Sequence, residues 1–178
     1  MSWMNQVGNI LKQYTSGGAA AGTQTAPDVN AHFDEVAKAV PSSTLADGIA
    51  AAMRSDKTPA LGDMVSSMFG QSNGEQKAGL LNQLLGSLNP AALTQILSSA
   101  GLGGLSGMLA GNTQLTPAQA QQVPPEVVQQ MANHAEKSSP TIVDTLSNFY
   151  AQHPTLVKTL GGAALSIALA KVAQHTQG

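Results

Sequence analysis

Cysteine is absent from this sequence of 178 residues, and charged residues are few. The lack of cysteine excludes disulfides and thiolate metal sites, and it leaves the redox compartment open. Charged residues make up 10% of the chain, against about a quarter in typical soluble proteins. A surface with so little charge repels other copies of the chain weakly, which favours self-association. The formal net charge of -2 gives no reason to expect a nucleic acid or an anionic membrane as partner.

Two further absences concern targeting and membranes. The N-terminus lacks the basic start, continuous apolar run and small-residue cleavage site of a signal peptide. No apolar run reaches the roughly 18–20 residues of a membrane-spanning helix, because Lys158 and Lys171 interrupt the best candidate. We therefore expect a cytoplasmic protein.

Residues 1–15 predict a separate amphipathic helix, and residues 16–25, rich in Gly and Ala, predict a flexible linker. A tethered apolar stripe must be covered, either by folding back onto the domain or by docking to a partner, another copy or a membrane surface. We prefer a protein partner or another copy, because membrane-surface helices usually carry several basic residues on the polar face and here only Lys12 does. The predicted partner-binding residues are Trp3, Met4, Val7, Ile10, Leu11 and Tyr14.

From residue 26 onward the apolar spacing is helical, and no stretch alternates with period two as a strand would. Prolines mark helix starts, where a missing N–H costs nothing, and several of them follow a capping residue. The clearest pairs are Thr58-Pro59, Asn89-Pro90, Thr116-Pro117 and Ser139-Pro140. The sequence therefore predicts an all-α fold, an orthogonal multi-helix domain with the N-terminal helix tethered to it.

Residues 154–172 predict one helix that is apolar on nearly every side, which is typical of a helix buried in a core. We expect it to be the central strut of the domain. The Gly-rich residues 101–114 predict a hinge between an N-terminal helical half, residues 26–100, and a second half, residues 115–178. A narrow seam of small residues predicts where another helix approaches the strut: Thr155, Thr159, Gly162, Ser166 and Ala173.

Four short motifs together resemble the YidB-like family of uncharacterised bacterial proteins. They are Gly101-Leu102-Gly103-Gly104-Leu105, Leu115-Thr116-Pro117-Ala118-Gln119, Ile142-Val143-Asp144-Thr145-Leu146 and Pro154-Thr155-Leu156-Val157. The resemblance covers roughly the last 75 residues and the N-terminal helix. It implies an all-helical fold in which residues 115–178 form a homeodomain-like unit, and it implies no catalytic residues. The helices inserted between Asp28 and Leu97 depart from the family's pattern.

A homeodomain-like unit raises the question of DNA binding, but residues 115–178 contain no arginine and no cluster of lysines. The histidines His32, His134, His153 and His175 show no i, i+3 or i+4 spacing, so the helical zinc motif is missing. No serine lies in a G-x-S-x-G elbow, and no G-K-[ST] phosphate loop is present. The sequence therefore predicts no catalytic, cofactor-binding or metal-binding residue.

These observations lead to a ranked expectation of function. We expect a non-enzymatic structural or interaction protein that forms homo-oligomers, or binds a protein partner, through the N-terminal amphipathic helix. The alternative is a peripheral membrane- or envelope-associated protein that uses the terminal helices. A helical DNA-binding module comes third, and an enzyme last.

Overall fold

The structure is a computed structural model that describes residues 2–15, 26–111 and 114–176, and the prediction of an all-α fold is confirmed over these residues. They form twelve α-helices and one short 3-10 helix, with no strand in the described ranges. Contacts between Cα atoms divide the chain into two compact units. Unit 1 comprises Met1–Pro59 with Ser147–Gly178, and unit 2 comprises Ala60–Leu146.

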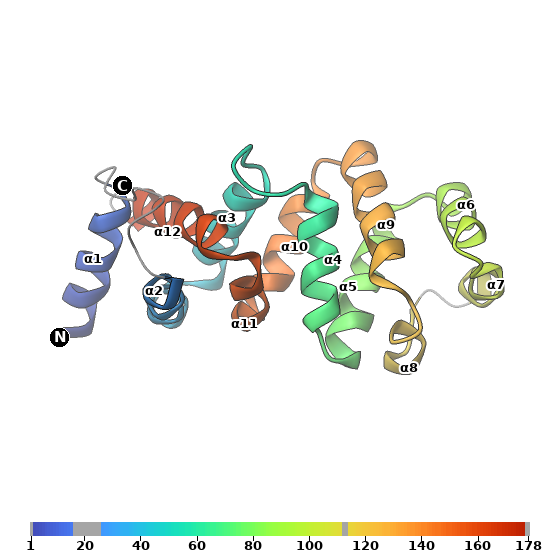
Figure 1. Cartoon of the computed structure of the whole chain (residues 1–178), viewed down its shortest axis with the longest axis horizontal. Coiled ribbons are helices and arrows are strands. Elements are labelled where there is room, and N and C mark those ends of the chain that lie inside the picture. Colours follow the sequence, from blue (N-terminus) through green and yellow to red (C-terminus); the bar gives the residue numbers. More distant parts are fainter. Residues whose placement is uncertain (1, 16–25, 112–113, 177–178) are drawn as a thin grey trace. The chain divides into compact units, whose positions relative to one another are not determined.

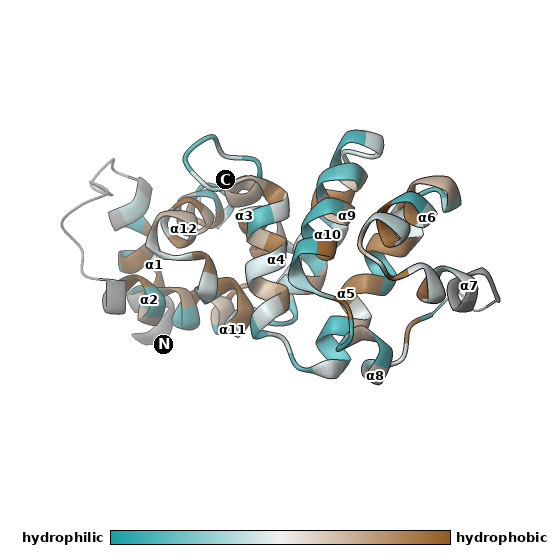
Figure 2. Ribbon diagram, turned by 45° about the vertical axis from the view of Figure 1, so that its right-hand side comes forward, coloured by the Kyte–Doolittle hydropathy of each residue, from teal (hydrophilic) through white to brown (hydrophobic). Residues whose placement is uncertain are grey.

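Unit 1 is built around its last helix. Helix α12 (Gly162–Thr176) packs against α1 (Ser2–Thr15), α2 (Ala26–Ala39) and α3 (Ser42–Met53) (Figure 1). Figure 2 shows hydrophobic residues along α3 and α12, where these two helices lie together. The residues of α12 that are fully or almost fully buried are Ala164, Leu165, Ala168, Leu169, Val172 and Ala173.

The helix predicted over residues 154–172 is interrupted in the structure. Helix α11 (Pro154–Val157) continues as a 3-10 turn, η1 (Lys158–Leu160), and the chain then turns at Gly161 before α12 begins. Gly161 has φ +89°, a conformation that only glycine adopts at low cost, so the helix cannot run through it. Within the described residues, no helix is both long and apolar enough to cross a membrane.

The predicted seam of small residues is not one continuous contact surface: Ala173 is completely buried, whereas the members at its N-terminal end are not. Thr155 and Thr159 are exposed, and no atom lies within 4 Å of where a Cβ of Gly162 would be. The close approach uses the other side of α12, where Ala168 and Val172 meet Gly48 of α3. Burial of apolar residues there, not the small seam, sets the orientation of α12.

Unit 2 contains six helices and the first half of a seventh. They are α4 (Leu61–Gln71), α5 (Gly74–Ser87), α6 (Pro90–Ser99), α7 (Gly103–Gly111), α8 (Pro117–Ala120), α9 (Pro125–Ser138) and the start of α10 (Ile142–Ala151). Helix α9 packs against α4, α5 and α6, and α5 also packs against α8 (Figure 1). Among the side chains that are completely buried are Val65, Met68, Phe69, Leu80, Leu81, Leu84 and Val128.

Two of the four proline-marked helix starts are confirmed. Asn89 accepts a hydrogen bond from the Ala92 amide at 2.7 Å and caps α6 at Pro90. Thr116 and Gln119 form a reciprocal capping box at the start of α8.

The other two predicted starts are wrong. Helix α4 begins at Leu61, and the hydroxyl of Thr58 instead donates to the carbonyls of Ala52 and Ser55 at 2.6 and 2.8 Å. Helix α10 begins at Ile142, two residues beyond Pro140. In both places the proline lies before the helix and not in its first turn.

The two units do not coincide with the predicted halves, residues 26–100 and 115–178. The contacts divide the chain after Pro59 and again after Leu146, inside α10, so the predicted homeodomain-like residues 115–178 are shared between both units. The Gly-rich residues 101–114 lie within unit 2, where Gly101 adopts φ +74° and α7 follows.

Candidate interaction site at the N-terminal helix

Helix α1 presents one apolar face to the rest of unit 1. Its apolar residues recur at helical spacing, and four of them are buried: Val7 is 9% exposed, Ile10 6%, Leu11 4% and Tyr14 6%. The helix packs against α12 and α2 of the same chain. Its outer face is polar, with Asn5, Asn9 and Lys12 exposed. The predicted stripe is therefore a single face, and here the chain itself covers four of its members.

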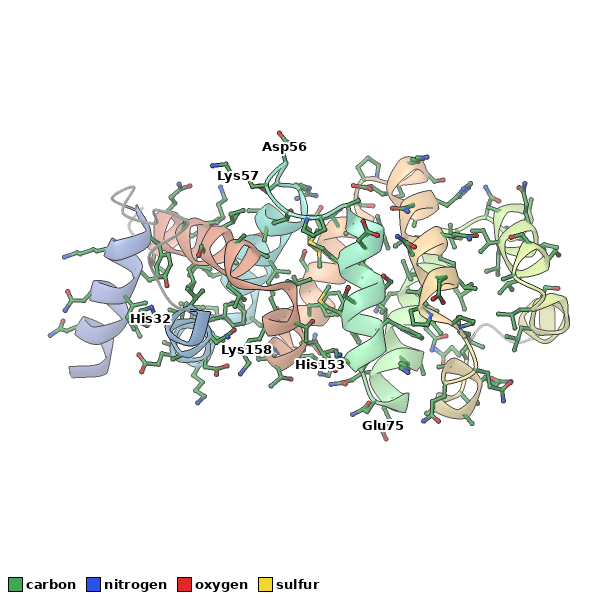
Figure 3. The ribbon with its side chains drawn as sticks, viewed as in Figure 1. His32, Asp56, Lys57, Glu75, His153 and Lys158 are labelled. Carbon is green, nitrogen blue, oxygen red and sulfur yellow. The ribbon has the colours of Figure 1, made fainter. Side chains whose placement is uncertain are left out.

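A polar contact lies at the C-terminal end of this face. The hydroxyl of Tyr14 lies 2.9 Å from Nδ1 of His32 on α2 and donates to it when that nitrogen carries no proton. The two rings meet edge to face, with centroids 6.0 Å apart and an interplanar angle of 83°. Figure 3 shows His32 on the side of α2 that faces α1. This contact fixes the register of α1 along α2.

The surface that receives α1 is apolar and braced. On α2, Val29, Phe33 and Val36 are almost completely buried. Asp34 of α2 pairs with Lys158 of η1, with Oδ2 and Nζ 2.8 Å apart. Figure 3 labels Lys158. Because η1 leads directly into α12, the ion pair ties α2 to the start of α12, the other helix against which α1 packs.

Two of the six predicted partner-binding residues cannot be placed, because the side chains of Trp3 and Met4 lie outside the described residues. The structure brings the other four together on one face and against their own chain. This is the fold-back arrangement that the sequence left open beside docking to a partner. Binding of a second protein through the stripe stays a prediction.

The histidines belong to different elements: His32 to α2, His134 to α9 and His175 to α12, with His153 preceding α11. The ring of His153 contacts that of Phe149, with centroids 4.8 Å apart and a tilt of 54°, and His175 Nε2 lies 3.6 Å from Oδ2 of Asp47. His134 lies in unit 2, on a groove between α6 and α9. Over the described ranges, no three His, Asp or Glu side chains come close enough to share a metal ion.

Sequence reasoning missed His32 as a contact of the stripe. The spacing of the histidines addressed only the helical zinc motif, whereas the ring of His32 pairs with Tyr14, eighteen residues earlier. A polar atom at the end of an apolar stripe, the hydroxyl of Tyr14, was the available signal, because such a hydroxyl usually finds a partner when buried.

Comparison with known proteins adds no relative to this picture. No protein-family model, no curated protein and no solved structure matches the sequence or the fold. The resemblance to the YidB-like family therefore stays a prediction that rests on its four motifs.

Proposed function

We propose that this is a non-enzymatic interaction protein that self-associates by exchanging α1 between copies. One observation carries the proposal: the apolar face of α1 is buried on α2 and α12, yet α1 joins the chain only through residues 16–25. A helix that docks as a separate element can make the same contacts on its own chain or on a second copy. Such exchange of an identical element is a low-cost route to dimers.

The composition of the tether supports the proposal. Residues 16–25 are Ser-Gly-Gly-Ala-Ala-Ala-Gly-Thr-Gln-Thr, a composition typical of flexible linkers. Ten such residues span at most about 33–36 Å when fully extended. That reach is enough for α1 to sample positions beyond its own docking surface.

Energetics sets the concentration at which exchange matters. Full burial of each large apolar side chain contributes about 1.5–3 kcal/mol, so the four buried residues of α1 favour a docked helix over an exposed one. The docked contacts are the same in the monomer and in the exchanged dimer. The equilibrium between these two forms therefore depends on the effective concentration of the tethered helix, which is on the order of millimolar for a short flexible linker. Exchange therefore rises with protein concentration and with anything that hinders docking in cis.

Light scattering of the full-length chain tests the proposal directly. We expect a monomer–dimer equilibrium that shifts toward dimer when residues 16–25 are deleted, because α1 then joins α2 directly and cannot fold back onto it. Leu11→Asp in the deleted chain should abolish the dimer, since it places a charge on the buried face. The matched control is Asn9→Asp, on the exposed face, which should leave the dimer intact. A shortened chain that stays monomeric up to millimolar concentration would contradict the proposal.

A cross-linking experiment identifies the surface. The chain has no cysteine, so one copy carrying Tyr14→Cys and a differently tagged copy carrying His32→Cys have no competing thiols. Joining of the two tags by a short bis-maleimide requires α1 of one copy to lie on α2 of the other. If the copies associate without this cross-link, association uses another surface and the exchange model is wrong.

A further inference from the structure

A groove lies between α6 and α9, within unit 2. Its volume is about 440 Å³, within the size range of small-molecule sites. Each helix contributes residues at i, i+3, i+4 and i+7, so one continuous face of each helix lines it. The lining residues are Ala92, Gln95, Ile96 and Ser99 of α6, and Gln130, Asn133, His134 and Lys137 of α9.

The lining is divided by chemistry. Ala92 and Ile96 are buried and supply the apolar part of the lining. The remaining side chains are polar, with three carboxamides, an imidazole, an ammonium and a hydroxyl, and the lining includes no carboxylate. The groove therefore combines a small apolar surface, several amide groups and a positive charge that no acid in the lining neutralises.

Most of these polar groups have nothing to bind within the protein. In the part of the chain that the structure describes, the side chains of Gln95, Gln130, Asn133, His134 and Lys137 make no hydrogen bond or ion pair. Their neighbours on the same helices do: Ser99 donates to the carbonyl of Ile96 at 2.8 Å, and Gln129 donates to Asp63. Gln95, Gln130 and Lys137 are exposed to solvent and Asn133 and His134 are half-buried, so these groups are open to a ligand.

The α9 wall of the groove is held against α4. A Cβ added at Gly62 would collide with the carboxamide of Asn133, so the Asn133 side chain lies directly on the backbone of α4. One turn earlier on α9, the carboxamide of Gln129 donates a hydrogen bond to the carboxylate of Asp63, which also belongs to α4. These two contacts limit how α9 can rotate against α4, which holds its other lining residues, Gln130, His134 and Lys137, in place at the groove.

We propose that this groove binds a short peptide or acyl-amino acid through its free carboxylate. Carboxamides offer both a donor and an acceptor, which is the complement of a peptide group. The ammonium of Lys137 and the imidazole N–H of His134 suit a carboxylate, and bonds of this charge-assisted kind are the stronger ones. The apolar surface of Ala92 and Ile96 takes a small apolar side chain.

A ligand pair that differs only in charge gives the sharpest test. Amide ¹H–¹⁵N spectra of the full-length chain are titrated with N-acetyl-Ala-Ala as the free acid and with its C-terminal amide. We expect shifts at groove residues with the acid and at least about fivefold weaker binding of the amide, because the amide lacks the charge that Lys137 recognises. Equal affinity for the two probes would overturn the assignment of the carboxylate.

Two lysine variants separate the groove from general electrostatics. Lys137→Gln should weaken binding of the acid about tenfold, whereas Lys57→Gln, the same change at an exposed lysine in unit 1, should leave it unchanged. Unaltered spectra of both variants without ligand show that they fold. An equal loss in both variants, an unaffected Lys137→Gln, or no shift at any groove residue up to 50-fold molar excess each contradicts the proposal.

Inorganic phosphate is the final probe. If phosphate shifts the same residues with the same affinity as the acid, the groove is a non-selective anion site and the peptide part of the proposal fails. If phosphate binds more weakly than the free acid, the amide groups and the apolar surface contribute to the affinity for the peptide as proposed.

Discussion

Gly48 of α3 lies directly against the backbone of α12 at Ala168. A Cβ at residue 48 would lie 2.7 Å from the carbonyl oxygen of Ala168 and 2.7 Å from Cγ2 of Val172. The carbonyl belongs to a regular helix and cannot move out of the way alone. The packing of α3 on α12 therefore depends on the absence of one side chain.

Gly48→Ala should lower the free energy of unfolding by about 1–3 kcal/mol, since overpacking forces backbone shifts. This is the reverse of the gain of up to about 1 kcal/mol that Gly→Ala usually brings inside a helix. Gly70→Ala in α4 is the matched control, because no atom lies within 4 Å of its Cβ position, and it should be neutral or stabilising. Urea unfolding of the three chains measures both effects, and equal stability of the two variants would contradict the close approach.

Gly161 should be irreplaceable for a different reason. Its φ of +89° and ψ of 170° suit only glycine, although nothing lies within 4 Å of a Cβ there. Gly161→Ala is therefore expected to cost about 1–3 kcal/mol through backbone strain alone. Gly162→Ala, one residue on and equally uncrowded, should be tolerated in the thermal unfolding of unit 1. Similar melting temperatures for the two variants would show that η1 and α12 are not separated by a strained turn.

Docking of α1 should respond more to its apolar residues than to its hydrogen bond. Leu11→Ala removes a side chain that is 4% exposed and should weaken docking by about 2–5 kcal/mol. Tyr14→Phe keeps the ring against His32 and loses only the part-buried hydrogen bond, about 0.5–1.5 kcal/mol. Hydrogen exchange of the α1 amides measures both; a larger loss of protection in Tyr14→Phe than in Leu11→Ala would contradict the ranking.

Tyr150 makes a prediction about alkaline pH. Its side chain is completely buried, its hydroxyl has no hydrogen-bond partner among the described residues, and burial raises the pKa of that hydroxyl well above its usual range. A raised pKa in the folded state means that stability is fully present below the unfolded value of about 10 and falls as pH rises above it.

Tyr150→Phe removes both the unsatisfied hydroxyl and this pH dependence. At pH 7 we expect the variant to be equal to or up to about 2 kcal/mol more stable than the parent chain. Above pH 10 its advantage should grow. Guanidinium unfolding at pH 7 and pH 11 checks this, and a variant that is clearly less stable at pH 7 would mean that the hydroxyl has a partner.

Local signals in the sequence predicted local structure well. Asn89 and Thr116 correctly predicted helix starts because the side chain of each caps the first turn of the helix that follows it. Thr58 looked the same but its hydroxyl is taken by the carbonyls of Ala52 and Ser55, in the turn before it. The path of the chain decides whether such a hydroxyl bonds to the turn before it or caps the helix after it. A capping pattern in the sequence does not contain that information.

Long-range pairing was beyond the reach of the sequence. The stripe that includes Val7 and Leu11 was predicted, but its cover on α2 and α12 was not, because apolar surfaces pair without a residue code. The same holds for the groove between α6 and α9. Its two faces are readable as i, i+3, i+4 and i+7 sets, yet nothing in either helix says that they oppose each other.

The division of unit 1 into two stretches of chain, Met1–Pro59 and Ser147–Gly178, has a consequence for synthesis on the ribosome. At about 5–20 residues per second, the 119 residues from Ala60 to Gly178 take roughly 6–24 s to be made. During that time the nascent α1, α2 and α3 have no α12 to cover them, whereas Ala60–Leu146 can form its internal contacts as soon as Leu146 has been made. A stop codon or a protease cut shortly before α12 would therefore leave unit 2 folded and unit 1 exposed to chaperones and degradation.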